Sequence, residues 1–447
     1  MNDGFIPFKG LGWAVAGLLA LTAIMSGSSG SQWDALRLRS DRTSKNELQR
    51  PSLLKKLLGD GSGTTTGTTT GTTTGTTTGT TTGTTTGTTT GTTTGTSTGT
   101  LTGTMTAAGY PELSMIPSNF TISNELVPAN IPPSNYPDDM GAFRFLCGPG
   151  QLLYDDPIMY PGQPGRSHLH QFYGNTAANG NSTYNSLRTT GQSTCMSPLN
   201  RSAYWMPALL DGKGNVVRPD YVAIYYKRWP KNSSNCTSQG IHCIPLPNGL
   251  RFIFGRDMTN LSAPPTGDFH FVCMTASGSY PPNGSGPNND GLGYPDMEGA
   301  LAVCSPGLVL GAVIMAPSCW DGKNLDSTNH RSHVSYQLRT GSGLTCPSNY
   351  PYAIPRFTLG ARWTIAQGDD TSKWTLASDA MAPNERHGST FHADWFGAWD
   401  NTTVATWTDN CIDKMLSCAG GNLGNGTMMK MYSGFSWLAT PRLVAVP

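Results

Sequence analysis

The sequence predicts a mainly β protein: an antiparallel β-sandwich or jelly-roll-like domain with long disulfide-stapled loops, preceded by a disordered stalk. Three observations favour this fold class. From about residue 110 onward, short runs of β-branched and aromatic residues alternate with clusters of Gly, Pro, Asn and Ser. No helical repeat of about 12 residues or more lies between these runs, as a βαβ architecture would require. All ten cysteines fall in the same part of the chain.

Residues 1–31 have the pattern of a signal peptide or an N-terminal membrane anchor. Lys9 precedes an apolar run at 11–25, and small residues follow it at 26–31. This run is short for a membrane span, which needs about 20 residues, but it fits the core of a signal peptide. The basic polar segment 32–62 comes next, and positive charge on that side favours a retained anchor. Both alternatives predict an exported protein, either secreted or held at the cell surface.

A stalk rich in Thr and Gly is predicted for residues 63–109. From Gly63 to Gly103 a glycine recurs every four residues, and Leu101 is the only large apolar side chain. Such a segment cannot bury enough surface to offset its ordering entropy, so we expect it to be disordered. Its root-mean-square reach would be about 35–40 Å. It is either a spacer that holds the domain away from a surface or a simple-sequence expansion outside the fold.

Residues 110–447 are expected to form one globular domain. Its clearest strand-like runs lie at 221–226, 250–254, 269–273 and 309–314. The cysteines form no Cys-x-x-Cys pair, which argues against a structural zinc site and favours up to five disulfides made in an oxidising compartment. Two pairs are close enough in sequence to close small loops, namely Cys236 with Cys243 and Cys411 with Cys418.

The composition excludes several classes of function. The net charge is +1 and charged residues make up 13% of the chain, so there is no basic surface for nucleic acid. No Gly-rich loop opens a helical pattern, which argues against a phosphate-binding protein. No nucleophile elbow of the Gly-x-Ser-x-Gly type occurs in the globular domain. We therefore expect no nucleic-acid partner, and contact with a membrane only through an N-terminal anchor.

Five of the eight histidines fall in three short clusters of the globular domain. His168 and His170 would project to the same face of an extended segment, because side chains alternate along a strand. The histidines of 330–333 would lie on one side of a turn or short helix. His392 and Asp394 repeat the two-residue spacing with a nitrogen and an oxygen. The candidate ligands of a divalent metal ion such as zinc or copper are His168, His170, His330 and His392.

The same clusters allow two other interpretations. The histidines could take part in metal-free catalysis or substrate binding, or they could make hydrogen bonds within buried loops. For the histidines outside the clusters we favour a structural role, and these are His242, His270 and His387.

Carboxylates and aromatic rings accompany the histidines. The nearby carboxylates are Asp155, Asp156, Asp321, Asp326, Asp394 and Asp400. The candidates for acid–base catalysis are Asp321, Asp326, Asp394 and His333. Rings beside polar groups favour a sugar-binding cleft, because a ring offers an apolar face to a sugar. The candidate substrate-binding residues are Trp320, Phe172, Tyr173 and Trp395, and a place in the core beneath the site is the alternative for each ring.

At these residues the chain resembles the DUF1996 domain of secreted fungal and bacterial proteins. The matching tracts are 156–158, 165–174, 202–207, 249–252, 318–322, 330–333, 392–395 and 397–400. The resemblance covers residues 145–420 in order, and Tyr173 stands where the family often has phenylalanine. Members are typically exported and some carry carbohydrate-binding modules. The resemblance therefore implies a connection to cell-envelope or extracellular polysaccharide, but it identifies no reaction.

The sequence thus leads to two hypotheses of function from different classes. The first is a carbohydrate-active enzyme, either a glycan hydrolase or a metal-dependent enzyme, that acts on cell-envelope or extracellular polysaccharide through the His and Asp clusters. The second is a non-catalytic carbohydrate-binding or structural module at the cell surface. A binding module has little use for five histidines and several aspartates in one place, whereas catalysis has. We therefore expect the three clusters to converge on one cleft.

Overall fold

The computed structural model describes residues 104–106, 109–237, 240–263, 269–279, 293–340, 343–433, 435 and 439–447. The predicted signal or anchor segment, the basic segment and most of the predicted stalk lie outside these residues. The last part of the predicted stalk contains strand β1 (Thr104–Met105), which pairs with β2 (Pro111–Glu112). Among the described residues, no helix is long and apolar enough to cross a membrane.

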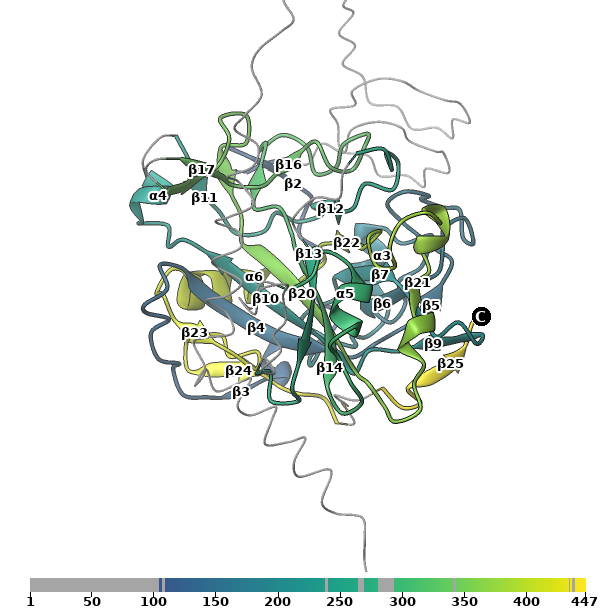
Figure 1. Cartoon of the computed structure of the whole chain (residues 1–447). Coiled ribbons are helices and arrows are strands. Elements are labelled where there is room, and N and C mark those ends of the chain that lie inside the picture. The colour runs from purple at the N-terminus through teal and green to yellow at the C-terminus, as the bar shows by residue number, and fades with distance from the viewer. Residues whose placement is uncertain are drawn as a thin grey trace, which may run out of the picture.

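Two large sheets form the centre of the domain (Figure 1). The six-stranded sheet has the order β13 (Phe269–Met274), β14 (Val309–Met315), β20 (Arg356–Thr364), β10 (Tyr221–Arg228), β4 (Gly141–Cys147) and β23 (Ser417–Cys418). The five-stranded sheet has the order β12 (Arg251–Gly255), β22 (His392–Phe396), β7 (Ala203–Pro207), β6 (His170–Gly174) and β5 (Leu152–Leu153). Neighbouring strands in both sheets are antiparallel except β23 with β4. The predicted mainly β fold is confirmed.

Smaller elements surround these sheets. One four-stranded sheet has the order β11 (His242–Cys243), β19 (Tyr352–Ala353), β15 (Cys319–Trp320) and β16 (Val334–Ser335). Another has the order β21 (Thr375–Leu376), β8 (Leu209–Leu210), β9 (Asn215–Val217) and β25 (Leu443–Ala445). Two-stranded ribbons pair β3 (Leu126–Pro128) with β24 (Thr427–Met429), and β17 (Leu338–Thr340) with β18 (Gly343–Thr345). The short helices are η1 (Ile122–Glu125), α3 (Tyr184–Thr189), α4 (Ser234–Thr237), α5 (Met297–Leu301), η2 (Thr371–Lys373), η3 (Asp379–Met381), α6 (Asn401–Trp407) and η4 (Thr408–Ile412).

The two large sheets pack against each other through aromatic side chains. Phe357 on β20 is buried, and its ring centroid lies 6.0 Å from that of Phe252 on β12. The same ring lies 5.3 Å from that of Trp395 on β22. Full burial of a side chain of this size stabilises the fold by about 1.5–3 kcal/mol. The inward faces of both sheets therefore form the main core, and the other face of the five-stranded sheet is left for different contacts.

The four aromatic rings predicted to bind substrate are all buried, with at most 1% of any of them exposed. Tyr173 and Trp395 belong to the main core. Phe172 stacks on Trp205, with ring centroids 5.3 Å apart. Trp320 donates its indole N–H to the backbone carbonyl of the nearby turn at Asn324. This placement is the core alternative, and it leaves these rings no exposed face for a sugar.

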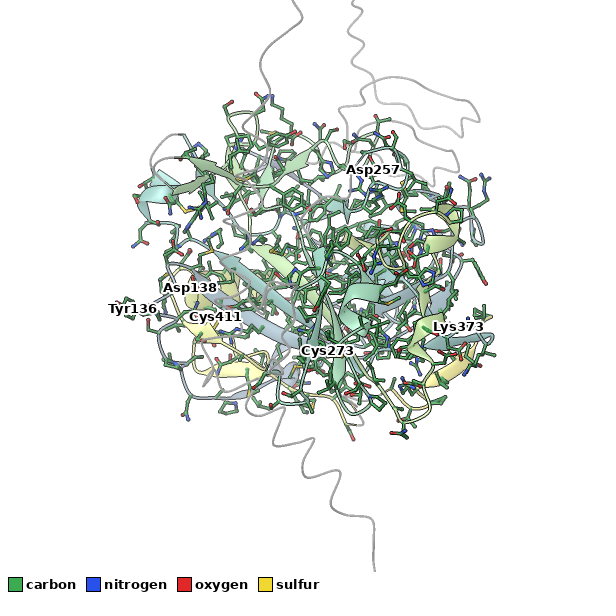
Figure 2. All side chains as sticks on the ribbon, in the orientation of Figure 1. Tyr136, Asp138, Asp257, Cys273, Lys373 and Cys411 are labelled. Carbon is green, nitrogen blue, oxygen red and sulfur yellow. A yellow bond between two sulfur atoms is a disulfide. The ribbon has the colours of Figure 1, made fainter. Side chains whose placement is uncertain are left out.

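Five disulfides pair all ten cysteines (Figure 2). The two predicted small loops are confirmed, since Cys236 pairs with Cys243 and Cys411 with Cys418. The longer loops are closed by the pairs Cys147–Cys195, Cys273–Cys304 and Cys319–Cys346. Five disulfides are consistent with an extracellular protein, because such bonds persist in oxidising compartments.

Gly255 determines the path of the chain at the end of β12. Gly255 ends β12 with a φ of +84°, where residues with a side chain are strained. A Cβ at this position would lie 2.6 Å from Ile314 Cδ1 and 2.8 Å from the carbonyl oxygen of Phe391. Only glycine fits this turn, which leads the chain from the five-stranded sheet into the loop at 257–259.

Candidate functional site

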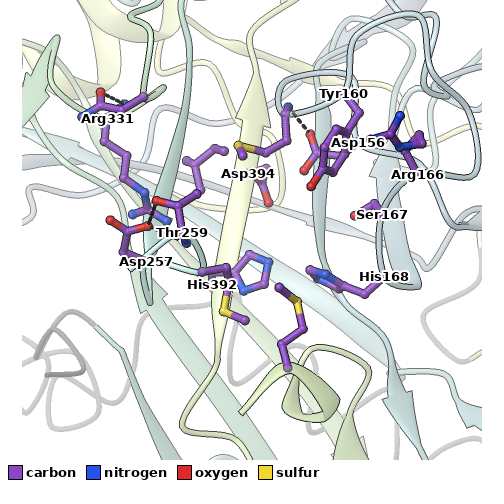
Figure 3. A pocket seen from close by; sticks show the side chains of 15 residues that line it. Asp156, Tyr160, Arg166, Ser167, His168, Asp257, Thr259, Arg331, His392 and Asp394 are labelled. Atoms are coloured by element: carbon purple, nitrogen blue, oxygen red, sulfur yellow. Dashed lines mark hydrogen bonds between the residues drawn. The ribbon is translucent and has the colours of Figure 1, made fainter. Parts of the chain in front are cut away.

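A pocket of about 160 Å³ lies on the side of the five-stranded sheet that faces away from the main core (Figure 3). Its lining comprises Asp156, Met159, Tyr160, Arg166, Ser167, His168, Ile253, Asp257, Met258, Thr259, Asn329, Arg331, Met381, His392 and Asp394. Residues from all three histidine clusters or their immediate flanks are present. The clusters therefore meet at one pocket, although His330 and His333 are not among its lining residues.

Strand alternation places the polar groups of β22 on the pocket side. His392 and Asp394 are two residues apart, so both project to the same face of the sheet. Asp394 is paired in register with Trp205 on β7 and with Ile253 on β12. On the other side of β7 lies β6, which begins at His170 and whose Phe172 is also paired with Trp205. His170 on β6 and His392 on β22 thus lie on the two strands that flank β7.

Three imidazole rings come together at the pocket: His168 and His392 line it, and His170, which is buried and is not a lining residue, adjoins both. The ring centroids of His168 and His170 are 4.3 Å apart, and those of His168 and His392 are 5.0 Å apart. The centroids of His170 and His392 are 5.9 Å apart. One nitrogen from each of the three residues lies within 4.8 Å of the other two. Figure 3 shows the His168 and His392 side chains next to each other, with their rings edge to face, and Asp394 nearby.

Backbone carbonyls fix the protonation of two of these rings. His170 Nδ1 lies 2.9 Å from the carbonyl oxygen of Asp155, and His392 Nδ1 lies 2.8 Å from that of Thr390. A carbonyl oxygen can only accept, so each Nδ1 is the donor and Nε2 carries the lone pair. Among the described residues, the buried Nε2 atoms of His168 and His170 have no hydrogen-bond partner. His170 combines both features, and this combination is typical of metal-binding histidines, whose second nitrogen donates to a carbonyl or carboxylate.

Burial keeps the three imidazoles neutral. Loss of solvation, with a smaller contribution from His170, lowers the pKa of His168 to about 2. Loss of solvation and the neighbouring His392 lower the pKa of His170 to about 3. The pKa of His392 lies well below its ordinary value for the same reason, with His168 as the second cause. Neutral imidazole is the form that binds a metal ion, so little proton competition is expected near neutral pH.

Two carboxyl groups lie beside the rings. Burial and the nearby Asp156 raise the pKa of Asp394 well above its ordinary value. Both carboxyl oxygens of Asp394 are buried without a hydrogen-bond partner among the described residues. Asp156 Oδ1 accepts the backbone N–H groups of Ile158 and Met159 at 2.9 and 2.8 Å, and burial raises its pKa. One oxygen of each carboxyl group and a nitrogen of His170 lie within 4.8 Å of one another.

These residues fit a divalent metal ion. Nitrogen and oxygen ligands lie about 2.0–2.2 Å from zinc, so the ligand atoms of one ion lie within about 4.4 Å of each other. Within each of the two groups that contain His170, the candidate ligand atoms all lie within 4.8 Å of one another. The unpartnered atoms on His168, His170 and Asp394 supply the lone pairs that an ion needs. His168, His170 and His392 would hold the ion, with Asp394 and Asp156 next to it.

The second histidine cluster makes a different kind of contact. His330 Nδ1 donates to Asp326 Oδ1 at 2.8 Å, and Arg251 Nε donates to Asp326 Oδ2 at 2.7 Å. His333 Nε2 donates to the carbonyl oxygen of Arg251, and His333 Nδ1 accepts the hydroxyl of Ser327, both at 2.9 Å. Both nitrogens of His333 are therefore occupied, and burial lowers its pKa. The predicted ligand His330 bonds directly to the predicted catalytic residue Asp326, and His333 bonds to Ser327 and Arg251. None of these three predicted residues lines the pocket.

The remaining predicted catalytic residue, Asp321, also serves its own turn. Its Oδ1 accepts the backbone N–H groups of Lys323 and Asn324 at 2.8 and 3.0 Å. Its Oδ2 accepts the side-chain amide of Asn324 at 2.7 Å. This is ordinary turn chemistry for Asp before Gly. Of the four predicted catalytic residues, Asp394 alone lines the pocket.

Arg331 is a pocket residue that the histidine pattern did not reveal. Its Nη1 donates to the carbonyl oxygen of Gly255 at 3.1 Å, and its Nη2 to that of Arg256 at 2.9 Å. These bonds hold a positive charge at the pocket wall, opposite Arg166 in Figure 3. Asp156 was noticed as a neighbouring carboxylate but not predicted as a site residue. For Arg331 and Asp156 alike, a position within a tract that resembles the family was the sequence feature that could have indicated a role in the site.

Comparisons with known proteins give a family but no activity. The model of the DUF1996 family, described as a domain of unknown function, matches residues 156–399. The matched range begins at Asp156 of the pocket and includes all three histidine clusters. No curated protein and no solved structure matches the chain.

Proposed function

The chain belongs to the DUF1996 family, whose function is unknown, and we propose that it is an exported, metal-dependent hydrolase acting on a cell-envelope or extracellular glycan. The observation that carries this proposal is the group of three neutral imidazoles, two buried and one half-buried, in which Nε2 of His168 and of His170 has no partner among the described residues. Buried polar atoms normally have partners, because leaving one unsatisfied costs about 1–3 kcal/mol. A bound cation would supply the missing partner.

The proposed chemistry follows from the groups around the cation site. A divalent ion acts as a Lewis acid and makes water a better nucleophile near neutral pH. The positive charge of an ion would favour the ionised form of Asp394, which burial otherwise disfavours. Asp394 would then accept a proton from the attacking water. Arg331, fixed by two carbonyl oxygens, would stabilise negative charge that develops on the substrate.

The choice of a glycan rests on the pocket rim and on the cellular setting. Asp257, Thr259 and Asn329 bring carboxylate, hydroxyl and amide groups to the lining, and these suit a substrate rich in hydroxyl groups. The ring of Tyr160, which is half-buried, takes the place of the buried rings as an apolar surface for a sugar. Five disulfides are consistent with an extracellular protein, where such polymers occur.

Metal content is the first test. Full-length protein exported by its host and purified without chelators is expected to contain about one divalent ion per chain, measured by elemental analysis. His168→Ala should lower the affinity for that ion by more than about 100-fold, because it removes a ligand. The matched control is His242→Ala, which changes an exposed histidine outside the pocket. A wild-type protein that binds no divalent ion, as purified or after addition of metals, would contradict the proposal.

A polysaccharide panel then separates the enzyme from the non-catalytic module. The wild type should release soluble product from at least one polymer, and His168→Ala should bind the same polymer without turnover. Binding by the wild type without any product, across the panel and with metals added, would favour the surface module instead.

A further inference from the structure

We propose that the bond cleaved in this pocket joins a small acyl group, such as acetyl, to the glycan, and that it is not a glycosidic bond. The inference deepens the proposed function and rests on it. Four observations support it: the depth of the polar groups, the apolar side chains beside them, the spacing of the carboxylates and the position of one guanidinium group.

The reactive groups lie where only a small substituent can reach them. Asp394 and His170 are 0% exposed, and His392 is 4% exposed. The pocket, which His392 and Asp394 line, has a volume of about 160 Å³, below the range of about 300–1,000 Å³ that is usual for pockets enclosing a drug-sized ligand. A glycosidic bond would need room for a sugar unit on each side of the reacting atom. An acyl substituent can enter this space while the sugar that carries it remains at the rim.

Apolar side chains adjoin the carboxyl groups. Ile253 is the in-register neighbour of Asp394 on β12. Met159, whose N–H binds Asp156, also lines the pocket, and so do Met258 and Met381. The methyl group of an acetyl substituent gains from such a lining. A sugar hydroxyl placed there would lose its hydrogen bonds to water without replacing them.

The two carboxyl groups beside the rings lie close together. The nearest oxygens of Asp156 and Asp394 lie within 4.8 Å of each other and of the same nitrogen of His170. Both groups are therefore close enough to contact the same small molecule. That arrangement suits proton transfer to and from a single attacking water.

Hydrolysis of an acyl group balances with the groups present. The oxygen of water forms a bond to the carbonyl carbon, and its proton passes to the Asp394 carboxylate. Negative charge develops on the carbonyl oxygen, and the fixed guanidinium of Arg331 lies at the pocket wall to stabilise it. The bond from the carbonyl carbon to the sugar oxygen or nitrogen then breaks. The leaving atom takes the proton from Asp394, and the products are a carboxylic acid and the free sugar hydroxyl or amine.

The test uses the full chain loaded with its metal and polysaccharides in matched acetylated and deacetylated forms. Acetate release and new reducing ends are measured in the same reactions. The expected result is acetate from the acetylated form without new reducing ends, and at least a 100-fold loss in Asp394→Asn, in which metal content is measured in parallel. Reducing ends without acetate would overturn the inference. A bound metal with neither product would also overturn it while leaving the metal site intact, whereas absence of metal binding would overturn the proposed function itself.

A second measurement tests the apolar lining. Met159→Ala should enlarge the acyl site and raise the ratio of butyryl to acetyl ester hydrolysis by about 10-fold, measured with 4-nitrophenyl esters. Met115→Ala is the matched control, because Met115 is 62% exposed and is not a lining residue. If Met159→Ala does not fold, Met258→Ala provides the same comparison. An unchanged ratio in a folded variant would show that these methionines do not bound the acyl site and would overturn the inference.

Discussion

Two histidine groups of this domain consist of the same residue types but satisfy their polar atoms in opposite ways. In the network of Asp326, His330 and His333, each imidazole has a partner within the protein. At the pocket, His168 and His170 each have a buried nitrogen with no partner in the part of the chain that the structure describes. The spacing of histidines in sequence is therefore a poor guide to their role. What distinguishes a binding group from a structural group is whether the protein has supplied all the partners.

The aspartates of the two groups show the same difference. Asp326 is largely buried, yet hydrogen bonds from His330 and the charge of Arg251 outweigh loss of solvation and lower its pKa. Asp394 has no hydrogen-bond partner among the described residues, and burial raises its pKa well above the ordinary range despite the charge of Arg331. One carboxyl group is stabilised in the ionised form by the fold. The other awaits a positive charge from outside the chain.

The largest expected effect is on metal binding. His170→Ala removes the residue that belongs to both donor groups around the pocket, so the affinity for the divalent ion should fall by more than about 100-fold. Equilibrium dialysis against a series of divalent ions measures this loss. The contrasting variant, His333→Ala, should keep its metal affinity within about threefold. Equal losses in both variants would erase the distinction between the two groups.

The next effect is on stability and belongs to the other group. Asp326→Ala leaves Arg251 and His330 without their shared partner, so the free energy of unfolding should fall by about 2–3 kcal/mol. Urea denaturation of the metal-free protein measures it. Asp394→Ala, assayed in the same way, should cost less, because Asp394 makes no hydrogen bond among the described residues. A larger loss for Asp394→Ala would reverse the comparison.

A smaller effect is expected from a residue that positions His170. The side chain of Asp155 accepts the backbone N–H groups of Gly165 and Gly180 at 2.8 and 2.7 Å, and its own carbonyl oxygen orients His170. In Asp155→Asn the side-chain nitrogen cannot accept, so one of these loop contacts is lost. Metal affinity should fall by about 10-fold while the metal-to-protein ratio at saturation stays unchanged. An unaltered affinity would mean that the loop does not need this carboxylate to hold His170.

The smallest effect is a pH dependence. Because the pKa of Asp326 is lower in the folded than in the unfolded protein, its contribution to stability is present above the unfolded value near 4 and is lost as pH falls through the folded value. The difference in unfolding free energy between wild type and Asp326→Asn should therefore shrink as pH falls below about 4. Urea titrations between about pH 3 and pH 7 measure it. A difference that grows toward acid pH would contradict the assigned sign.

The alternation of side chains along strands explains both successes and errors of the sequence analysis. The two-residue spacing of His392 and Asp394 on β22 correctly indicates a shared face. The same rule puts Tyr173, three residues after His170, on the opposite face, and likewise Trp395 relative to His392. Proximity in sequence to the histidines was a weaker argument for these rings. The alternation could have assigned both to the core.

Other features depend on contacts that no local pattern encodes. His330 has a φ of +56°, and its backbone carbonyl accepts the N–H of Ile253 on β12. This backbone conformation directs Arg331 toward the pocket. It also directs His333 toward Arg251, a residue distant in sequence. The mainly β class and the two small disulfide loops followed from composition and spacing. The pairing of the remaining cysteines and the contacts of this turn could be identified only from the three-dimensional fold.

The position of the ligands along the chain bears on how the protein matures. His168 and His170 lie near the start of the family match, whereas His392 lies near its end, and they meet only across β7. A nascent chain could not assemble this site until almost the whole domain had been synthesised. Metal capture would then report completed folding, because an ion that binds only the folded state stabilises that state by mass action. If the protein is exported as proposed, metal loading would follow export, and the ion would come from the surroundings of the cell rather than from its cytoplasm.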